Sequence, residues 1–307
     1  MLSVLITYYN ERTLLTECLE SLAGQMDGID EVLIYDDASA YPAADYIAHT
    51  ERVRVIRGQS NIGPSRARNR LLAESRSAYI HFHDSDDLFD PKWAETVALA
   101  LSKNAVDALF SEVSFFVDDR SLRRESVMGL QSVIDGQDFL SFCILGSLLT
   151  PSGTYRKDIV TAIGGYRSDV WQSEDFDFHI RLIASGITYC IVAEPLVLCR
   201  SRPDSRSQNR VEVLQDSLKA LRGFSVELPD SCRKDIAERA ARIGAALYSL
   251  GAVSGYREAF RLADECGPPR LGGRHPGFRR LAGVVGLEWA ERIAAKYRRL
   301  IRPGATA

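Results

Sequence analysis

The first hundred residues alternate between two hydrophobic patterns, and this alternation constrains the fold more than any other feature. Continuous apolar runs predict strands, and apolar residues at helical spacing predict helices. The expected strands are residues 2–6, 31–35, 53–56 and 78–82, and the expected helices are residues 11–22, 43–48 and 64–75. Strand–helix alternation of this kind predicts a mostly parallel sheet with right-handed crossovers. The chain should therefore be an α/β protein with helices flanking the sheet.

The rest of the chain is less regular and then becomes helical. The expected elements are strands at 107–117 and 187–198, the second broken at Pro195, a charged loop or hairpin at 118–129, and a helix at 174–184. From about residue 211 the pattern turns helical and strands disappear. We expect one domain over residues 1–210 and a helical extension over residues 211–307.

Composition narrows the class of protein. A net charge of −3 over 307 residues makes no case for nucleic-acid binding. The six cysteines show no C-x-x-C spacing, so reduced thiols are expected rather than disulfides. The chain starts directly into a strand pattern, and no apolar stretch approaches the roughly 20 residues that span a bilayer. We expect a cytoplasmic chain without a signal peptide.

Acidic residues follow two of the predicted strands. Asp36 and Asp37 come after the second strand, and Asp84-Ser85-Asp86-Asp87 comes after the fourth. The carboxyl ends of parallel strands meet at one edge of a sheet, where open α/β sheets bind ligands. Crowded carboxylates repel one another unless a cation compensates, and oxygen ligands suit Mg²⁺ or Mn²⁺. The alternative is a solvated acidic turn, with Asp90-Pro91 opening the next helix.

A second polar segment, Asn61-Ile62-Gly63-Pro64-Ser65-Arg66-Ala67-Arg68-Asn69, opens a predicted helix. Gly63 permits a tight turn, and Pro64 suits the first helical position. Free backbone N–H groups and arginines at a helix start form a ready site for a phosphate or pyrophosphate. Arg57, at the end of the preceding strand, adds a cation to the same edge. The alternative is a well-capped helix with solvent-facing arginines.

Five segments, taken together and in order, resemble the family 2 glycosyltransferases with a GT-A fold. They are Ser3-Val4-Leu5-Ile6-Thr7-Tyr8-Tyr9-Asn10, Asp36-Asp37-Ala38-Ser39, the 61–69 segment, Asp84-Ser85-Asp86-Asp87 and Glu174-Asp175. The likeness covers about residues 1–205. It implies a Rossmann-like sheet with a nucleotide-binding half (1–105) and an acceptor and catalytic half (106–210), followed by the helical extension.

The resemblance implies a nucleotide-sugar donor, with UDP as the expected nucleotide, and a bound Mn²⁺ or Mg²⁺. The segment from Thr7 would line the nucleobase pocket, and Asp37 would bind the base. Asp86 would ligate the metal that bridges the two phosphates, while Asp84 would face the ribose and reach the metal through water. The expected donor-binding residues are Thr7, Tyr8, Tyr9, Glu11, Asp37, Arg57, Asn61, Gly63, Arg68, Asp84, Ser85, Asp86 and Arg202.

The resemblance also implies a catalytic base. Asp175 matches the family's general base, which takes the proton of the acceptor hydroxyl in a single in-line displacement. Glu174 and Trp171 would contact the acceptor or the donor sugar. The alternatives are that these acids only favour the dipole of the 174–184 helix, and that Trp171 belongs to the core.

One position departs from the family pattern. Many relatives carry a histidine after the last core strand, where it completes the metal site, and Arg202 stands at the matching place. Arginine is always protonated and cannot ligate a metal, but it can clamp a diphosphate. His81 and His83 flank the acidic motif, and we expect both to pack rather than to bind the metal.

The expected function is inverting transfer of a sugar from a nucleotide-sugar donor to a glycan or lipid-linked acceptor, in bacterial surface polysaccharide biosynthesis. A nucleotidyltransferase is disfavoured because no glycine-rich loop with a basic residue follows the first strand. A non-catalytic module that binds nucleotide sugars is disfavoured by the intact Asp175.

The C-terminal end is basic. Residues 257–302 hold eleven Lys and Arg against five Asp and Glu. An amphipathic end of this kind is a candidate for peripheral contact with an anionic membrane, which would place the chain at the inner face of that membrane. A solvated helix face is the alternative, and the helical tail is also a candidate for self-association into a homo-oligomer.

Overall fold

The computed structural model describes residues 2–117, 128–146, 148–203, 205–272 and 274–301. The chain divides into two compact units, Met1–Gln208 and Asn209–Ala307. Except for its last two residues, the loop or hairpin expected at 118–129 lies outside the described residues.

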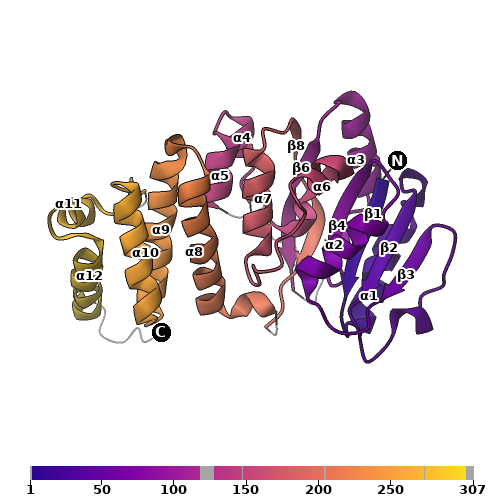
Figure 1. Ribbon diagram of the computed structural model, residues 1–307, viewed down its shortest axis with the longest axis horizontal. Helices are drawn as coiled ribbons and strands as arrows, with labels where there is room; N and C mark the ends of the chain where they lie inside the picture. Colours follow the sequence, from indigo (N-terminus) through magenta and orange to yellow (C-terminus); the bar gives the residue numbers. More distant parts are fainter. Residues whose placement is uncertain (1, 118–127, 147, 204, 273, 302–307) are drawn as a thin grey trace. The chain divides into compact units, whose positions relative to one another are not determined.

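The first unit is built on an eight-stranded sheet with the order β3-β2-β1-β4-β7-β6-β8-β5 (Figure 1). Its first half is the predicted parallel arrangement. The strands are β1 (Leu2–Tyr8), β2 (Glu31–Asp36), β3 (Val53–Arg57) and β4 (Tyr79–Asp84). The apolar runs that predicted these strands are largely buried, because helices cover both faces of the sheet.

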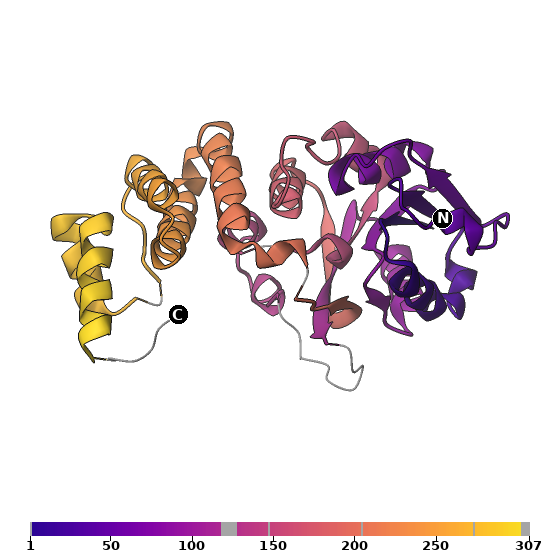
Figure 2. The same ribbon diagram turned by 90° about the horizontal axis from the view of Figure 1, so that it is seen from below.

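Side chains of β1 alternate between those two faces. Val4 and Ile6 pack in one core with α1 (Arg12–Ala23) and α3 (Trp93–Lys103). Leu5 points to the opposite face, where α2 (Pro64–Glu74) contacts β1 and β2. Figure 2 shows helices on both sides of the strands.

The strand register aligns the two acidic clusters. Thr7 of β1 pairs with Asp84 of β4 on one side, and Tyr8 pairs with Asp36 of β2 on the other. The carboxyl ends of β1, β2 and β4 therefore meet at one edge, as the acidic motifs predicted.

The second half of the sheet is mixed. Strand β6 (Ala108–Phe116) runs parallel to β8 (Tyr189–Arg200), and β5 (Leu88–Phe89) pairs antiparallel with β8. Strand β7 (Gly153–Arg156) inserts antiparallel between β4 and β6. It was not predicted, because its Gly- and Thr-containing sequence carries no strand period.

The predicted break at Pro195 is wrong, since β8 continues through it to Arg200. Val192 pairs with Ser111 of β6, and Pro195 pairs with the next residue, Glu112. The register therefore shifts on both sides of Pro195, which has no N–H to donate to the ladder.

The remaining helices of this unit are short except for one. They are α4 (Gln131–Ile134), α5 (Phe139–Leu145), α6 (Lys157–Ala162) and α7 (Glu174–Ala184). Helix α7 has the bounds predicted from its hydrophobic period. The helix expected at 43–48 is only a 3₁₀ turn, Ala43–Asp45, whose first N–H donates to Asp36 Oδ2 at 3.0 Å.

The start predicted for α3 at Asp90-Pro91 is also wrong, because the helix begins at Trp93. Asp90 instead closes the turn before it. Its carboxylate accepts from Lys92 N at 3.0 Å, and its carbonyl accepts from Trp93 N at 2.9 Å.

The second unit is helical, as the sequence predicts. Its helices are α8 (Arg210–Glu227), α9 (Arg233–Ser249), α10 (Val253–Cys266), α11 (Pro276–Val285) and α12 (Leu287–Ile301). A core of buried residues such as Leu221, Ile236 and Leu262 joins α8, α9 and α10. Over the described part of the chain, no helix is both long and apolar enough to cross a membrane.

Candidate active site

A cavity of about 550 Å³ opens at the carboxyl edge of β1 and β4. Its walls come from the turns after β1, β2, β3 and β4, from the start of α7 and from the segment after β8. Every site residue predicted from the sequence lines it except Arg57. Those residues are Thr7, Tyr8, Tyr9, Glu11, Asp37, Asn61, Gly63, Arg68, Asp84, Ser85, Asp86, Trp171, Glu174, Asp175 and Arg202.

Asp84 ends β4 and forms an ion pair with Arg68. Arg68 Nη2 lies 2.6 Å from Asp84 Oδ1, and the hydroxyl of Thr7 donates to the same oxygen at 3.4 Å. Burial alone would raise the pKa of Asp84, but the guanidinium of Arg68 lowers it. Asp84 is therefore a carboxylate that stays ionised.

Asp86, the predicted metal ligand, faces Arg202. Arg202 Nη2 lies 3.0 Å from Asp86 Oδ2 and 2.5 Å from Glu11 Oε1, and Ser85 Oγ donates to Glu11 Oε2 at 3.0 Å. Burial, Asp84 and Glu11 raise the pKa of Asp86 to about 6, while Arg202 opposes the rise. The raised pKa reflects crowded negative charge, which a bound cation relieves.

The acidic turn after β4 can hold a divalent cation through oxygen donors. Within the described ranges, no three His, Cys, Asp or Glu side chains gather closely enough to hold a metal by themselves. Mg²⁺ is usually bound by one or two carboxylates, with water and substrate phosphates as the other ligands, and Mn²⁺ also suits carboxylate sites. Asp86, with Asp84 nearby, fits that donor set.

The acidic turn after β4 is supported by three buried residues, Asp87, His81 and His83. Asp87 is buried, and its carboxylate accepts from Arg200 N at 2.8 Å. His81 Nε2 and His83 Nδ1 lie 3.2 Å apart, and burial lowers the pKa of His83 to about 4. His83 stacks on Phe89 at 3.8 Å between ring centroids. Both histidines are therefore neutral packing residues, as predicted.

Glu174, at the start of α7, is held between two arginines. Its Oε1 lies 3.1 Å from Arg68 Nη1 and 3.1 Å from Arg206 Nη2. Arg68 is buried, and its guanidinium also lies over the ring of Tyr166 at 5.1 Å. The chain Asp84–Arg68–Glu174–Arg206 thus connects the acidic turn to the first turn of α7.

Asp175 lies beside this chain of charges without an ion-pair partner among the described residues. Its carboxylate accepts one hydrogen bond, from Phe176 N at 2.7 Å. Burial, followed by the charge of Glu174, raises the pKa of Asp175 to about 7. A carboxyl with that pKa exchanges a proton near neutral pH, as a general base must.

The turn at 61–63 is fixed by Asp37 and covered by Trp171. The two oxygens of Asp37 accept from Ile62 N at 2.8 Å and from Gly63 N at 2.9 Å. Gly63 has φ +80°, and a Cβ there would come within 2.9 Å of the Trp171 ring. Only glycine satisfies both conditions, and Trp171 is a half-exposed wall of the cavity rather than a core residue.

Arg57 is the predicted donor residue that does not line the cavity. Its Nη1 lies 2.7 Å from Asp36 Oδ2, and its Nη2 donates to Ser39 O at 2.9 Å. Asp36 is fully buried and also accepts from Ser39 N at 2.8 Å. Asp36 is thus an interior support for the turn after β2, not a surface cap, and the position of Arg57 favours a structural role.

The sequence reasoning missed several residues of the cavity wall. Arg206 is the most consequential, because it pairs with Glu174 and donates to Trp171 O at 3.2 Å. The basic run that begins at the last residue of β8, with arginines at 200, 202 and 206, was the available signal. The other lining residues include Leu149, Thr150 and Pro151 from the 3₁₀ turn before β7, and Gln172, Ser205 and Ser207.

Comparison with known proteins gives the family. Residues 3–157 match the family model described as glycosyl transferase family 2. An uncharacterized glycosyltransferase of Haemophilus influenzae is 26% identical over 213 residues, 65% of this chain and 68% of that protein. The putative glycosyltransferase EpsH of Bacillus subtilis is 38% identical over 97 residues, 30% of this chain and 28% of that protein.

Solved structures support the fold. The crystal structure of S. aureus TarS 1–349 in complex with UDP matches with a TM-score of 0.68 at 16% identity, covering 97% of this chain and 91% of that one. The complex of the same protein with UDP-GlcNAc matches with a TM-score of 0.66. At this identity the likeness concerns the fold, and it confirms the GT-A arrangement predicted from the sequence, with helices after it. The family match covers half of the chain, so this protein is a glycosyltransferase that belongs to family 2.

Proposed function

We propose that the protein transfers a sugar, with inversion, from a UDP-sugar to a hydroxyl of a glycan or lipid-linked acceptor in surface polysaccharide assembly. The observation that carries this proposal is that the acidic turn after β4 and the start of α7 line one cavity. It holds Asp84 and Asp86 together with a carboxyl, Asp175, whose pKa is raised to about 7. The UDP and UDP-GlcNAc complexes of TarS support a uridine nucleotide as the donor's carrier.

In the proposed reaction Asp175 acts as the general base. The acceptor hydroxyl gives its proton to Asp175, and its oxygen attacks the anomeric carbon from the face opposite the diphosphate. The bond from that carbon to the diphosphate oxygen breaks, UDP leaves with the electron pair, and Asp175 later releases the proton to solvent. A single displacement of this kind inverts the anomeric centre.

The other charged residues bind the donor in this proposal. Arg202 reaches into the cavity and can move from Asp86 to the diphosphate. A Mn²⁺ or Mg²⁺ ion held by Asp86, with Asp84 nearby, would neutralise charge on the departing UDP. Glu174, fixed between two arginines, positions Asp175 and contributes to the raised pKa of that base.

The test is Asp175→Asn in the full chain, assayed against a panel of UDP-sugars beginning with UDP-GlcNAc. Donor hydrolysis and transfer should fall by on the order of 10² to 10⁴-fold, while calorimetric binding of UDP persists. Asp169→Asn, an exposed acid outside the cavity, is the matched control and should behave as wild type. Normal turnover in Asp175→Asn would refute the base assignment.

The same assay separates the alternatives. A nucleotidyltransferase would instead release pyrophosphate from UTP and a sugar phosphate. A non-catalytic module would bind UDP-sugar and leave it intact with every acceptor. Release of UDP coupled to glycosidic bond formation distinguishes the proposed function from both.

A further inference from the structure

Helix α12 presents an apolar stripe on the side that faces away from its own unit. Leu287, Ala290 and Glu291 are buried, and α12 contacts α9, α10 and α11. Three large side chains, four residues apart, are exposed instead: Trp289 (57%), Ile293 (46%) and Tyr297 (64%). Residues at i, i+4 and i+8 follow one face of a helix. A helix that only met water would carry polar residues there.

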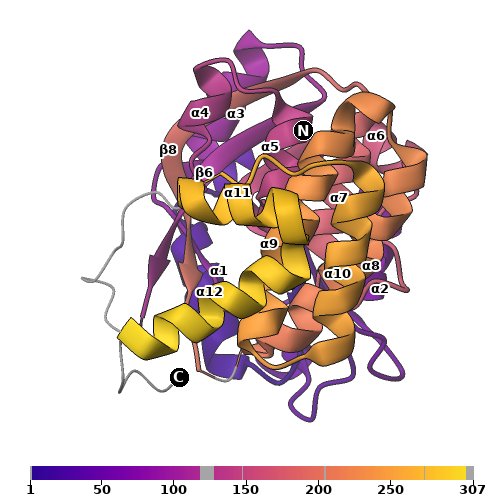
Figure 3. The same cartoon turned by 90° about the vertical axis from the view of Figure 1, so that its left-hand side faces the viewer.

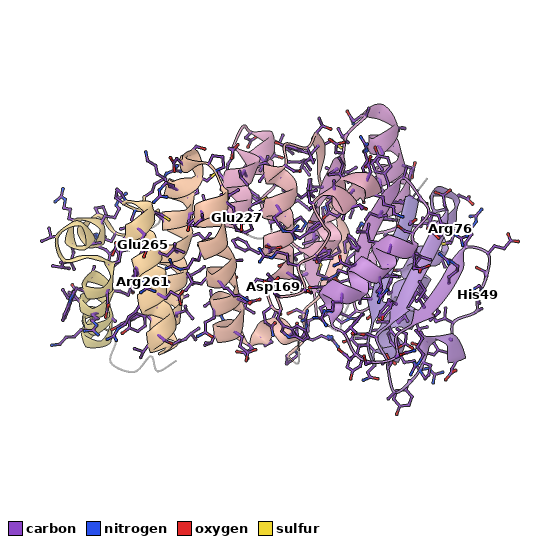
Figure 4. The ribbon with its side chains drawn as sticks, viewed as in Figure 1. His49, Arg76, Asp169, Glu227, Arg261 and Glu265 are labelled. Atoms are coloured by element: carbon purple, nitrogen blue, oxygen red, sulfur yellow. The ribbon has the colours of Figure 1, made fainter. Side chains whose placement is uncertain are left out.

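Basic residues accompany this stripe. Lys296, one residue before Tyr297, is exposed, and on α11 the exposed residues include Arg279, Arg280 and Val284. Figure 3 views this unit with α11 and α12 toward the reader, and the two helices contact each other. Arg279, Arg280 and Lys296 make no ion pair with any residue that the structure describes. Some exposed cations of this unit do form ion pairs, as Arg261 does with Glu265 at 3.8 Å on α10 (Figure 4).

We propose that the exposed faces of α11 and α12 bind an anionic lipid surface, with the helices lying in the plane of the headgroups. Trp289, Ile293 and Tyr297 would enter the boundary between headgroups and acyl chains, where aromatic rings are favoured. Arg279, Arg280 and Lys296 would meet the phosphates, because an anionic lipid surface attracts basic residues that lie near it.

The charges favour lipid over a second copy of the chain. The acids of α12 are already engaged: Glu291 is buried and pairs with Arg274, and Glu288 pairs with Arg257 and Arg292. No carboxylate remains on the stripe to meet Lys296 of another copy. A two-fold contact would bring these cations against like charges, whereas an anionic headgroup layer neutralises them.

This surface is separate from the proposed chemistry, since none of its residues lines the cavity. The inference can fail while the transferase proposal stands, and the reverse also holds. If both hold, the surface would bring the enzyme to the phase in which a lipid-linked acceptor resides.

The experiment is flotation of the full chain with two vesicle types, phosphatidylcholine alone and phosphatidylcholine with added phosphatidylglycerol. The wild type should float with the anionic vesicles only, and added salt should weaken binding. One variant removes the stripe (Trp289→Ser, Ile293→Ser and Tyr297→Ser together), and a second reverses the charge (Arg279→Glu, Arg280→Glu and Lys296→Glu together). Each should lower vesicle binding at least about tenfold, a loss of roughly 1.4 kcal/mol.

The controls change exposed residues of the same kinds on other helices. They are Val226→Ser on α8 and Lys234→Glu on α9, and both should float like the wild type. All the changed side chains are exposed, so the circular dichroism spectrum of each variant should match that of the wild type. Absence of wild-type binding, or binding that survives both triple variants, would overturn the proposal. A wild-type dimer in light scattering that becomes monomeric in the stripe variant, without vesicle binding, would instead assign the face to self-association.

Discussion

At the scale of single residues, most of the acids that line the cavity are held in ion pairs with arginines. Arg68 neutralises Asp84 and Glu174, and Arg202 neutralises Asp86 and Glu11. Asp175 has no such partner in the described part of the chain, and burial, followed by the charge of Glu174, raises its pKa to about 7. Arg68 thus keeps Asp84 ionised, whereas the proposed base can exchange a proton near neutral pH.

The pH dependence of transfer should report Asp175. The base works only when ionised, and its raised pKa means that it is protonated below about pH 7 and ionised above. We expect kcat/KM to rise about tenfold per pH unit on the acid side and to level off above neutrality. Initial rates across the pH range, with Asp169→Asn as the control, measure this. A profile that is flat through neutral pH would contradict it.

Replacing Arg68 should lower the free energy of unfolding. Arg68→Met leaves Asp84 and Glu174 without their shared counter-charge, and breaking a buried ion pair costs about 3 to 5 kcal/mol. Urea titration should show that loss in the free energy of unfolding. Arg66→Met, an exposed arginine on the same helix, should change stability by less than about 0.5 kcal/mol. Equal effects of the two changes would contradict the role given to Arg68.

Arg202 should compete with a metal ion for Asp86. In Arg202→Met the carboxylate loses its partner at 3.0 Å, so Mn²⁺ should bind more tightly when no nucleotide is present. A partly exposed ion pair is worth up to about 1 kcal/mol, which corresponds to about fivefold in affinity. UDP binding should weaken in the same variant. Arg206→Met, whose partner is Glu174, is the control for metal binding, and weaker Mn²⁺ binding to Arg202→Met would disprove the competition.

At the scale of elements, short turns at strand ends bring the site together. The turn at 61–63 is held by Asp37, which directly follows the neighbouring strand β2, and the turn starts α2, which carries Arg68. The first turn of α7 presents Glu174 and Asp175 from the other side of the cavity. Gly63 lies against Trp171, and Arg68 pairs with Glu174, so these two parts meet at both places.

Gly63→Ala should therefore damage both stability and donor binding. The alanine would adopt a positive φ that costs about 1 kcal/mol or more, and its methyl group would press on the Trp171 ring. We expect weaker UDP binding by calorimetry and a lower unfolding free energy. In Gly63→Ala combined with Trp171→Ala, the stability lost to the clash with the ring should return. The stability lost to the positive φ should not. Gly24→Ala, with a negative φ and open space around its Cβ, is the control and should be neutral.

At the scale of the whole molecule, the chain is two compact units with different tasks in our proposals. The unit at 1–208 holds the cavity, and the unit at 209–307 holds the lipid-facing helices. Each has its own buried apolar residues. The domain division expected from the sequence, at 210, remains a proposal to be tested by unfolding.

Scanning calorimetry of the full chain should show two transitions. A saturating mixture of UDP and Mn²⁺ binds only the unit with the cavity, so it should raise one midpoint by about 5 to 10 °C and leave the other in place. In Asp86→Ala both transitions should remain, and UDP with Mn²⁺ should raise the midpoint of the cavity-containing unit by less. A single transition that moves as a whole would show that the units unfold together.

The sequence by itself determined the parallel half of the sheet, the α7 helix and most of the residues that line the cavity. These features depend on local properties of the sequence. The properties are the period of apolar residues, the backbone freedom of Gly63, and the position of acidic residues at the ends of strands. Helix α7 kept its predicted bounds because its period and its acidic first turn agree. The family resemblance came from the same local segments, which the family match then confirmed.

The tertiary structure decided which residues that are distant in the sequence come into contact. Strand β7 pairs residues of β4 with a segment some seventy positions away, and its weak pattern gave no sign of that partner. The pairing of Arg206 with Glu174 and of Arg202 with Asp86 depends on where the segment after β8 returns across the sheet edge. The pKa of Asp175 rises only because folding buries it beside Glu174. A local pattern encodes which residues are buried, but charge balance depends on distances that only the folded chain sets.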